Sequence, residues 1–471
     1  MSNEFDVLVV GGGITGLTVA QQLTARSPRT SVAVLEAGDR TGGIVGSYRR
    51  EGFTVDTGPH GFVVYGPGGV SDLATELGLA DELMAAEPAA QRLFLLRDDH
   101  VLEPMPTSVT SFLRSALLSP MGKLRAAAEI VMPRRLAEEP FFHFTARRFG
   151  VEVARALAVP AVLGVTGGDS KNLSVDAKFP FIRYLEKEYR SILVGALRTT
   201  WQQQRAAGKR ILTLPKFEEF GMRLFSFRGQ GMQRLVDALE KSVAEHVRLG
   251  ARVSALDRDG DGWRATLTSG EPVRAAQVVL ALPAYAAAAL LGPHLPRFAA
   301  TLTEIPHPDV RVVGIGYREA DLARQPDGIG FLTIPTEHTH ILGTIHTSTI
   351  FPDQAPPGTV LIRTLAGGVQ DRGFAELSSV DAVETVHQDL RRVFGVRGRP
   401  VFSFDHLWRR AIPEYQVGHR NRIDAGLAEV ARLGGVHLAG NTYHGVGIND
   451  CVRDARRVAD DLVGTPVTVS S

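Results

Sequence analysis

A glycine-rich turn near the start of the chain carries the strongest chemical signal in the sequence. It consists of Gly11, Gly12, Gly13, Ile14, Thr15 and Gly16, between an apolar run at residues 5–10 and an Ala- and Leu-bearing segment. In a strand–turn–helix unit, glycines at 11, 13 and 16 let the backbone approach a diphosphate at the helix N-terminus. Glu36 ends the next expected strand, where a carboxylate can bind ribose hydroxyls. The pattern predicts a dinucleotide site.

A second glycine cluster, Arg40 with Gly42 and Gly43, follows at once. An arginine beside glycines suits a diphosphate, and this position just after Glu36 is typical of FAD proteins rather than of NAD dehydrogenases. A third tight turn, formed by Gly58, Pro59, His60 and Gly61, could approach an isoalloxazine ring. These residues together predict FAD as the cofactor.

Composition limits the classes of protein to consider. The 471 residues are 44% hydrophobic and 22% charged, which predicts a large globular chain of roughly two or three domains. A net charge of +1 predicts no nucleic-acid partner. The single cysteine, Cys451, excludes an intramolecular disulfide framework and favours a reducing, cytoplasmic setting. We expect no cleaved targeting peptide, because the first apolar, strand-like run already begins at Val7. We expect no transmembrane span, because Pro283 interrupts the most apolar stretch.

Hydrophobic periodicity predicts the elements that would position these turns. A strand–helix–strand unit is expected at 5–36, helical segments at 71–83, 108–210 and 381–394, strands at 92–103, 251–256, 263–268, 278–282 and 436–439, an alternating sheet at 310–365, and a last helix ending at 462. The fold class is therefore α/β, with a discontinuous FAD-binding Rossmann-like domain. We divide the chain into FAD-binding parts at 1–88, 213–284 and 406–471, a mainly helical insertion at 89–212, and a mixed-sheet substrate domain, largely antiparallel, at 285–405.

Beyond these turns, several longer runs resemble the protoporphyrinogen oxidase family, within the wider group of flavin amine oxidase-like proteins. The runs are residues 164–169 with 173–175, 227–232, 343–352, 412–415 with 418–419, and 439–451. The resemblance covers nearly the whole chain, and the last run is its most specific part.

The resemblance implies further contacts with FAD. They fall on Ile44, on the turn of Gly58, Pro59, His60 and Gly61, and on Val253, Trp408, Asn441, Val446, Gly447 and Ile448. Backbone amides of residues 446–448, at a strand-to-helix turn, would stabilise negative charge on the reduced ring. For Trp408 a role as a core aromatic is an equal alternative, and for His60 we expect packing beside the flavin rather than catalysis.

For the substrate, the resemblance places a tetrapyrrole against apolar walls with one cation for a propionate. The contacts that it implies are Gly164, Ile329, Gly330 and Leu332, with Arg92 as the cation; His346 is a further candidate that does not come from the resemblance. Related proteins often carry Arg directly before an aromatic residue, but here Leu93 stands in that place and Arg92 precedes it. A slip of one residue on a strand turns a side chain to the opposite face, so Arg92 as a surface charge stays open. His346 has core packing as its alternative.

The helical insertion also carries a membrane signal. Between residues 104 and 135, basic side chains outnumber acidic ones among apolar neighbours: Arg114, Lys123, Arg125, Arg134 and Arg135 against Glu129. Basic amphipathic helices can lie on anionic lipid, so we expect peripheral membrane attachment, with a solvated basic face as the alternative. The resemblance also suggests a homodimer.

The resemblance implies oxidation of protoporphyrinogen IX to protoporphyrin IX in haem biosynthesis. Six electrons would leave in three flavin cycles, with oxygen as acceptor. We expect flavin-centred chemistry with no metal and no assigned acid or base, since His338 and His340 have no convincing acidic partner. The alternatives are a coproporphyrinogen III oxidase, a flavin amine oxidase, and a non-enzymatic binding protein of GDP-dissociation-inhibitor type.

Overall fold

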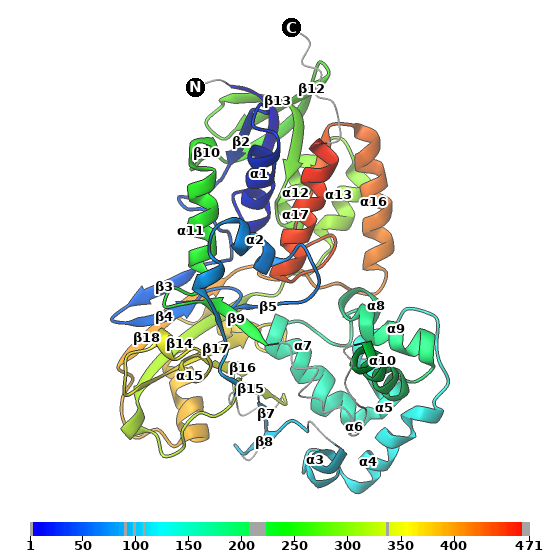
Figure 1. The fold of residues 1–471 in the computed structure, drawn as a ribbon, viewed down its shortest axis with the longest axis vertical. Helices are drawn as coiled ribbons and strands as arrows, with labels where there is room; N and C mark the ends of the chain where they lie inside the picture. The colour runs from blue at the N-terminus through cyan, green and yellow to red at the C-terminus, as the bar shows by residue number, and fades with distance from the viewer. Residues whose placement is uncertain are drawn as a thin grey trace.

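The structure, a computed structural model, describes residues 3–88, 92–97, 100–106, 109–206, 223–335 and 339–463. Figure 1 shows an upper half built on one sheet, standing over a second sheet and a group of helices that lie side by side. The mixed α/β class is confirmed.

The first sheet forms the centre of the upper half. Its order is β10 (Val247–Arg248), β2 (Val32–Leu35), β1 (Glu4–Val10), β13 (Pro272–Leu280), β12 (Gly262–Leu267) and β11 (Val253–Asp259), with β19 (Val436–Leu438) also paired to β13. Strands β10, β2, β1, β13 and β19 run parallel. Both faces of a parallel sheet are covered, which explains the continuous apolar runs of β1 and β2. The sheet draws strands from three separate stretches of the chain.

Helices cover both faces of this sheet (Figure 1). Val7 and Val9 pack with α1 (Ile14–Arg26), α2 (Val70–Glu76), α11 (Gln233–Ser242) and α17 (Ile448–Val463). Leu8 and Val10 face α12 (Ala284–Leu291), α13 (Pro296–Thr303) and α16 (His419–Leu433). The alternation along β1 therefore separates two cores, one on each side of the sheet.

The second sheet is mixed. Its order is β18 (Phe402–Trp408), β14 (Val310–Arg318), β17 (Thr359–Gly367), β16 (Ile341–His346), β15 (Gly330–Thr333), β7 (Leu93–Leu96) and β8 (Leu102–Pro104). All its pairs are antiparallel except β15 with β7. Helix α15 (Ser379–Phe394) packs on one face, and the hairpin of β3 (Ser47–Arg50) and β4 (Phe53–Asp56) packs on the other. Residues 93–104 thus join this sheet from within the range expected to be mainly helical.

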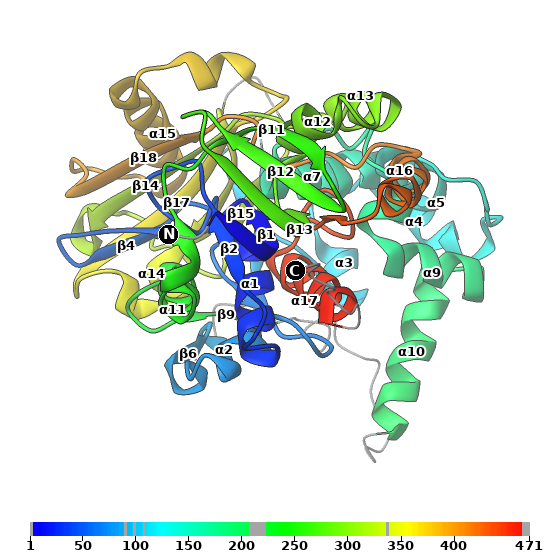
Figure 2. The ribbon, with the colours of Figure 1, turned by 90° about the horizontal axis from the view of Figure 1, so that it is seen from above.

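The helical group fills the remaining part of the lower half, and Figure 2 shows α10 projecting from it. Its members are α3 (Val109–Arg114), α4 (Pro120–Ala127), α5 (Phe141–Phe149), α6 (Val151–Val153), α7 (Val159–Thr166), α8 (Val175–Lys178), α9 (Pro180–Tyr189) and α10 (Ile192–Ala206). Its core combines apolar residues with buried ion pairs, including Arg148 with Glu129 and Arg183 with Glu186. None of the helices that the structure describes has the length and apolar character needed to cross a membrane.

Smaller elements connect these parts. Strands β5 (Phe62–Val63), β9 (Leu224–Phe227) and β6 (Leu83–Ala85) form a three-stranded sheet. A short helix, α14 (Thr347–Ile350), follows β16. The domain boundaries that we drew from the sequence stay predictions.

Candidate functional site

The first glycine turn joins β1 to α1, and its glycines have different roles. Gly11 has a φ of +106°, and a Cβ there would lie 2.4 Å from the Ala281 carbonyl oxygen. A Cβ on Gly16 would lie 1.9 Å from the Gly11 oxygen. Gly13 is different, because its Cβ would meet nothing closer than the Gly43 Cα at 3.9 Å. Gly11 therefore allows the turn to lie against the chain that follows β13, and Gly16 allows α1 to pack against β1 and the turn, whereas Gly13 leaves space at the helix N-terminus.

Glu36 is held at the end of β2 by two backbone amides. The Gly12 amide donates to its Oε2 at 2.7 Å, and the Gly38 amide donates to its Oε1 at 2.7 Å. The Ala251 amide donates to the Glu36 carbonyl at 2.8 Å, which brings the start of β11, with Val253, to the same edge. A fixed, half-buried carboxylate at this edge suits a ribose.

The second glycine cluster lies directly against the first. The Gly42 amide donates to the Gly12 carbonyl at 2.8 Å. Arg40 binds carbonyls of its own loop, those of Thr41 at 3.0 Å and Gly43 at 2.8 Å. A Cβ on Gly58 would lie 2.0 Å from the Ile44 carbonyl oxygen, so the third turn packs directly against the residue that follows the second. The three predicted turns are thus neighbours in space.

A fourth turn, residues 440–448, leads from β19 into α17 beside the first. A Cβ on Gly440 would lie 3.9 Å from the Thr15 Oγ1. The Gly440 amide donates to Asp454 at 2.9 Å, and Asp454 pairs with His444 at 2.8 Å. These contacts bring Asn441, Val446, Gly447 and Ile448 to the same end of the parallel strands as Gly11–Gly16. Ligands of open parallel sheets bind at that end.

Tyr415 holds this fourth turn. Its hydroxyl donates to the Asn441 carbonyl at 2.6 Å and accepts from the Gly445 amide at 3.1 Å. Its ring stacks on His419 with centroids 3.9 Å apart, and the His419 Nε2 lies 2.9 Å from the Thr442 oxygen. Burial lowers the pKa of His419 to about 4 and raises the pKa of Tyr415 well above its ordinary value. The sequence patterns assign no role to either residue, although Tyr415 falls in the run 412–415 and His419 in the run 418–419.

The turn at 56–61 is held from the second sheet. Trp408 donates its Nε1 hydrogen to the Thr57 carbonyl at 2.7 Å. Arg363, on β17, donates to the carbonyls of Asp56 at 2.8 Å and Gly58 at 2.7 Å. His60 is buried, with its Nδ1 3.0 Å from an Asp56 carboxylate oxygen. The sequence patterns assign no role to Arg363 either, and its sequence signal is a single cation within an apolar strand.

The residues expected at the substrate lie in the second sheet or directly beside it. A Cβ on Gly164 would lie 2.5 Å from the Leu332 Cδ2, so α7 packs tightly there. Ile329 packs beside Phe351, and its carbonyl accepts from the His346 amide at 2.9 Å. Gly330 begins β15.

The His346 ring lies in the core on the α15 side, edge-on to Phe331 and Phe394, with its Nδ1 2.9 Å from the Asp327 oxygen. Burial lowers its pKa to about 4, so the ring is neutral at pH 7. This environment favours the packing alternative for His346.

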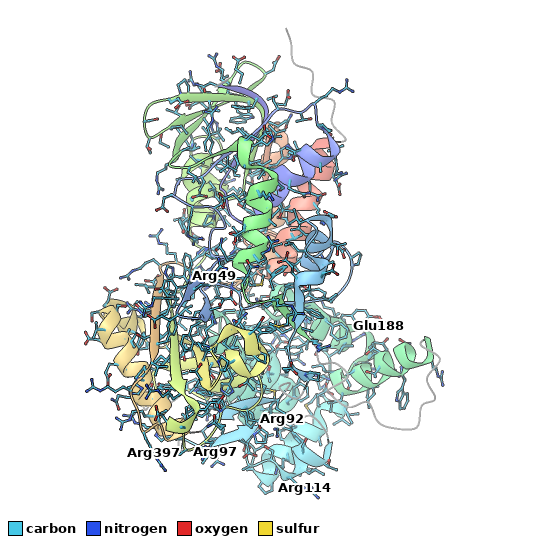
Figure 3. All side chains as sticks on the ribbon, turned by 60° about the vertical axis from the view of Figure 1, so that its left-hand side comes forward. Arg49, Arg92, Arg97, Arg114, Glu188 and Arg397 are labelled. Atoms are coloured by element: carbon cyan, nitrogen blue, oxygen red, sulfur yellow. The ribbon has the colours of Figure 1, made fainter. Side chains whose placement is uncertain are left out.

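Arg92 lies at the surface of the lower half (Figure 3). Its side chain is 61% exposed and forms an ion pair with Asp327. Its backbone carbonyl accepts from the Ile329 amide at 2.8 Å. The backbone thus touches the expected substrate wall, while the guanidinium already has a carboxylate partner.

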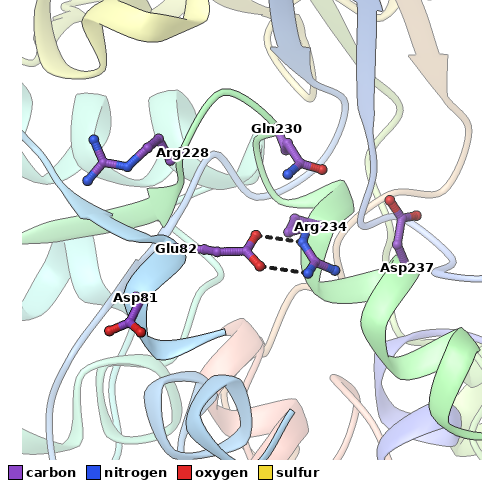
Figure 4. Close-up of a pocket in the computed structure, with 6 residues that line it drawn as sticks. All are labelled: Asp81, Glu82, Arg228, Gln230, Arg234 and Asp237. Atoms are coloured by element: carbon purple, nitrogen blue, oxygen red, sulfur yellow. Dashed lines mark hydrogen bonds and ion pairs between the residues drawn. The ribbon is translucent and has the colours of Figure 1, made fainter. Parts of the chain in front are cut away.

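Other chemistry-bearing groups lie outside this region. A surface hollow of about 500 Å³, shown in Figure 4, is lined by Asp81, Glu82, Arg228, Gln230, Arg234 and Asp237. Glu82 and Arg234 neutralise each other there through bonds of 2.6 and 2.7 Å. In the described part of the chain no three His, Cys, Asp or Glu side chains gather as a metal site, and His338 lies outside that part.

The geometry fits FAD. Gly13 provides open space at a helix N-terminus for a diphosphate, and Glu36 provides a fixed carboxylate for a ribose. The turns at 56–61 and 440–448 would flank the ring at the far end. A Cβ on Gly13 would extend into the expected path of the diphosphate.

Comparison with known proteins agrees with this geometry. The family described as flavin containing amine oxidoreductase matches residues 14–463. The chain is 33% identical to coproporphyrinogen III oxidase of Propionibacterium freudenreichii, over 97% of this chain and 90% of that protein. It is 31% identical to chloroplastic protoporphyrinogen oxidase 1 of Arabidopsis thaliana, over 97% and 88%.

A solved structure extends the agreement. A protein of Exiguobacterium sp. 255-15 that was assigned as a protoporphyrinogen oxidase superposes with a TM-score of 0.83 at 26% identity, covering 99% of this chain and all of that one. The chain therefore belongs to the flavin-containing amine oxidoreductase family, in its porphyrinogen oxidase group, and is an FAD-dependent oxidoreductase.

Proposed function

We propose that the chain oxidises protoporphyrinogen IX to protoporphyrin IX in haem biosynthesis, with oxygen as electron acceptor. The observation that carries this proposal is the convergence of four turns at one end of the parallel strands, in a chain that matches porphyrinogen oxidases almost end to end. Coproporphyrinogen III is the second candidate substrate, because the Propionibacterium relative is named for it.

The chemistry needs six electrons and six protons to leave the porphyrinogen. Bound FAD would supply a two-electron acceptor, so three rounds are needed, and three oxygen molecules would become three hydrogen peroxide molecules. The residues of this chain would orient the macrocycle against Gly164, Ile329 and Leu332 and exclude water. With His346 neutral and packed in the core, no side chain is assigned as acid or base.

Anaerobic mixing tests the substrate. The FAD-bound protein is mixed separately with protoporphyrinogen IX and coproporphyrinogen III, and flavin bleaching and porphyrin fluorescence are followed. Faster bleaching by protoporphyrinogen supports the proposal, and faster bleaching by coproporphyrinogen favours the second candidate. If neither compound bleaches the flavin, the proposal that the chain oxidises a porphyrinogen is wrong. His346→Ala tests whether this histidine takes part in catalysis. We expect the variant to retain turnover.

We also propose that the helical group contacts the cytoplasmic face of a membrane. Apolar side chains are exposed along and beside α3 and α4: Leu113, Met121, Leu124, Ile130, Val131 and Leu136. Arg114, Lys123, Arg134 and Arg135 lie in the same segment, where Lys123 also donates to the Leu113 carbonyl at 2.8 Å and Arg134 to the Lys187 carbonyl at 3.2 Å. Arg125 donates to two backbone carbonyls, and Glu129 is buried with Arg148. Apolar side chains among basic ones suit an anionic lipid surface.

Vesicle flotation tests this contact. We expect the protein to float with vesicles that contain anionic lipid, and the double substitution Met121→Glu, Leu124→Glu to abolish flotation. Val380→Glu is the matched control, because Val380 is 78% exposed on α15, outside the helical group. Equal flotation of all three proteins would contradict the proposed surface. The expected homodimer remains a prediction.

A further inference from the structure

A buried arginine, Arg363, extends from the second sheet to the turn at 56–61. Only 8% of its surface is exposed. Its Nε donates to the Asp56 carbonyl at 2.8 Å, and its Nη2 donates to the Gly58 carbonyl at 2.7 Å. Removing a guanidinium from water is costly, so a cation in the middle of an apolar strand needs a compensating interaction.

The Arg363 guanidinium forms no ion pair with a carboxylate in the described part of the chain. Within the described ranges, no carboxylate oxygen lies within 4.0 Å of it, although the charge of Asp56 acts on it. Asp56 is itself fully buried and accepts from the Ser47 hydroxyl at 2.5 Å and the Met232 amide at 2.8 Å. Burial lowers the pKa of Arg363 to about 10, so it is protonated at neutral pH.

Strand register shows which way Arg363 points. Arg363 pairs with Ile345 across β17 and β16, so both side chains lie on the same face of the sheet. Ile345 and Ile329 both pack against the apolar cluster that contains Phe351, and the Phe351 ring lies 5.5 Å from the His60 ring. Arg363 therefore lies behind the turn at 56–61, on the face that holds the expected substrate wall.

We propose that Arg363 is a positioning residue that holds the turn at 56–61 against the flavin ring and supplies the positive charge that stabilises the reduced, anionic ring. Two carbonyl bonds fix the turn, and a desolvated cation acts more strongly than one in water. The inference rests on the placement of the flavin ring at this turn, which is part of the proposed function.

Sulfite binding to the FAD-bound protein tests the charge. Sulfite adds to oxidised flavin and leaves the ring anionic, so its affinity reports the positive potential without any substrate. We expect Arg363→Met to weaken sulfite binding by about tenfold or more and to lower the flavin midpoint potential. Arg363→Lys should retain most of the sulfite affinity, because the charge remains, but bind FAD more weakly, because one ammonium cannot replace the two-carbonyl fork.

Arg311→Met is the matched control. Arg311 is also a buried arginine of this sheet, but it pairs with Asp405 at 3.3 Å and donates to the Leu377 carbonyl at 2.8 Å, away from the turn. Wild-type sulfite affinity and potential in Arg363→Met would overturn the inference. If Arg363→Met is recovered without FAD, Arg363→Lys decides, and a tenfold loss of sulfite affinity there would overturn it too. If the wild-type protein itself does not retain FAD, the proposed cofactor site is wrong, and this outcome is distinct from an effect of Arg363.

Discussion

Two glycine turns lie side by side at the end of the first sheet, and they are held in different ways. The turn at 11–16 is fixed by backbone contacts, such as the bond from the Gly11 amide to the Leu35 carbonyl at 2.8 Å. The turn at 440–448 is fixed by side chains, chiefly the Tyr415 hydroxyl and Asp454. A side chain added to the closely packed glycines of the first turn should therefore destabilise the whole fold. Removing one of the side chains that hold the other turn should weaken that turn and leave the fold intact.

The largest expected effect is at Gly16. Gly16→Ala would place a Cβ 1.9 Å from the Gly11 oxygen and should destabilise the protein by ~3 kcal/mol or more, because α1 must move off the sheet. Gly13→Ala is the matched variant, since its Cβ would meet nothing closer than the Gly43 Cα at 3.9 Å. It should keep the wild-type melting temperature without FAD but lose most of its FAD affinity. Thermal unfolding and FAD titration of both variants check the contrast, and tight FAD binding by Gly13→Ala would contradict it.

The next effect is at Tyr415. Tyr415→Phe removes two hydrogen bonds and leaves the Asn441 carbonyl and Gly445 amide without this partner, at a cost of ~1–3 kcal/mol. FAD affinity should fall by about tenfold with the fold intact. Tyr443→Phe is the control, because the buried Tyr443 hydroxyl has no hydrogen-bond partner among the described residues. Equal FAD affinities in a titration of the two variants would show that Tyr415 does not hold the turn.

Acid should loosen the fourth turn through His419. Burial lowers its pKa from 6.5 to about 4, so between these values the unfolded chain binds more protons than the folded one. The stabilisation, worth ~3 kcal/mol, is complete above pH 6.5 and is lost as pH falls toward 4. Urea unfolding across this range should show a shallower pH slope for His419→Gln than for wild type. Parallel slopes would rule out His419 as a contributor.

The smallest effect is at Trp408. Trp408→Phe keeps an aromatic ring but loses the bond to the Thr57 carbonyl, so FAD affinity should fall by only about threefold. Isothermal titration with FAD measures the change. A loss as large as that of Tyr415→Phe would mean that the third turn depends on side chains as strongly as the fourth does.

The sequence alone predicted the contacts that arise within short stretches. Glycine spacing predicted the turn at 11–16, and periodicity predicted most elements. The strand expected at 278–282 overlaps the end of β13 (Pro272–Leu280), and the helix expected at 381–394 lies within α15 (Ser379–Phe394). Element ends differ by a few residues, because hydrophobic patterns mark faces rather than ends. The range 92–103 was expected as one strand, but it holds two, β7 and β8, that pair with each other antiparallel. The parallel pairing of β7 with β15 was not expected, because that partner is more than two hundred residues away.

The tertiary structure decided which side chains converge and which charges are free to act. Arg92 is a cation in the right segment, but only the structure pairs it with Asp327. Arg363 and Tyr415 reach turns that are distant in sequence, at Gly58 and Asn441. Local chemistry determines what a turn can bind, because a glycine's backbone freedom depends on its immediate neighbours. The position and charge of a bound ring depend on packing between sheets, which no single stretch of residues encodes.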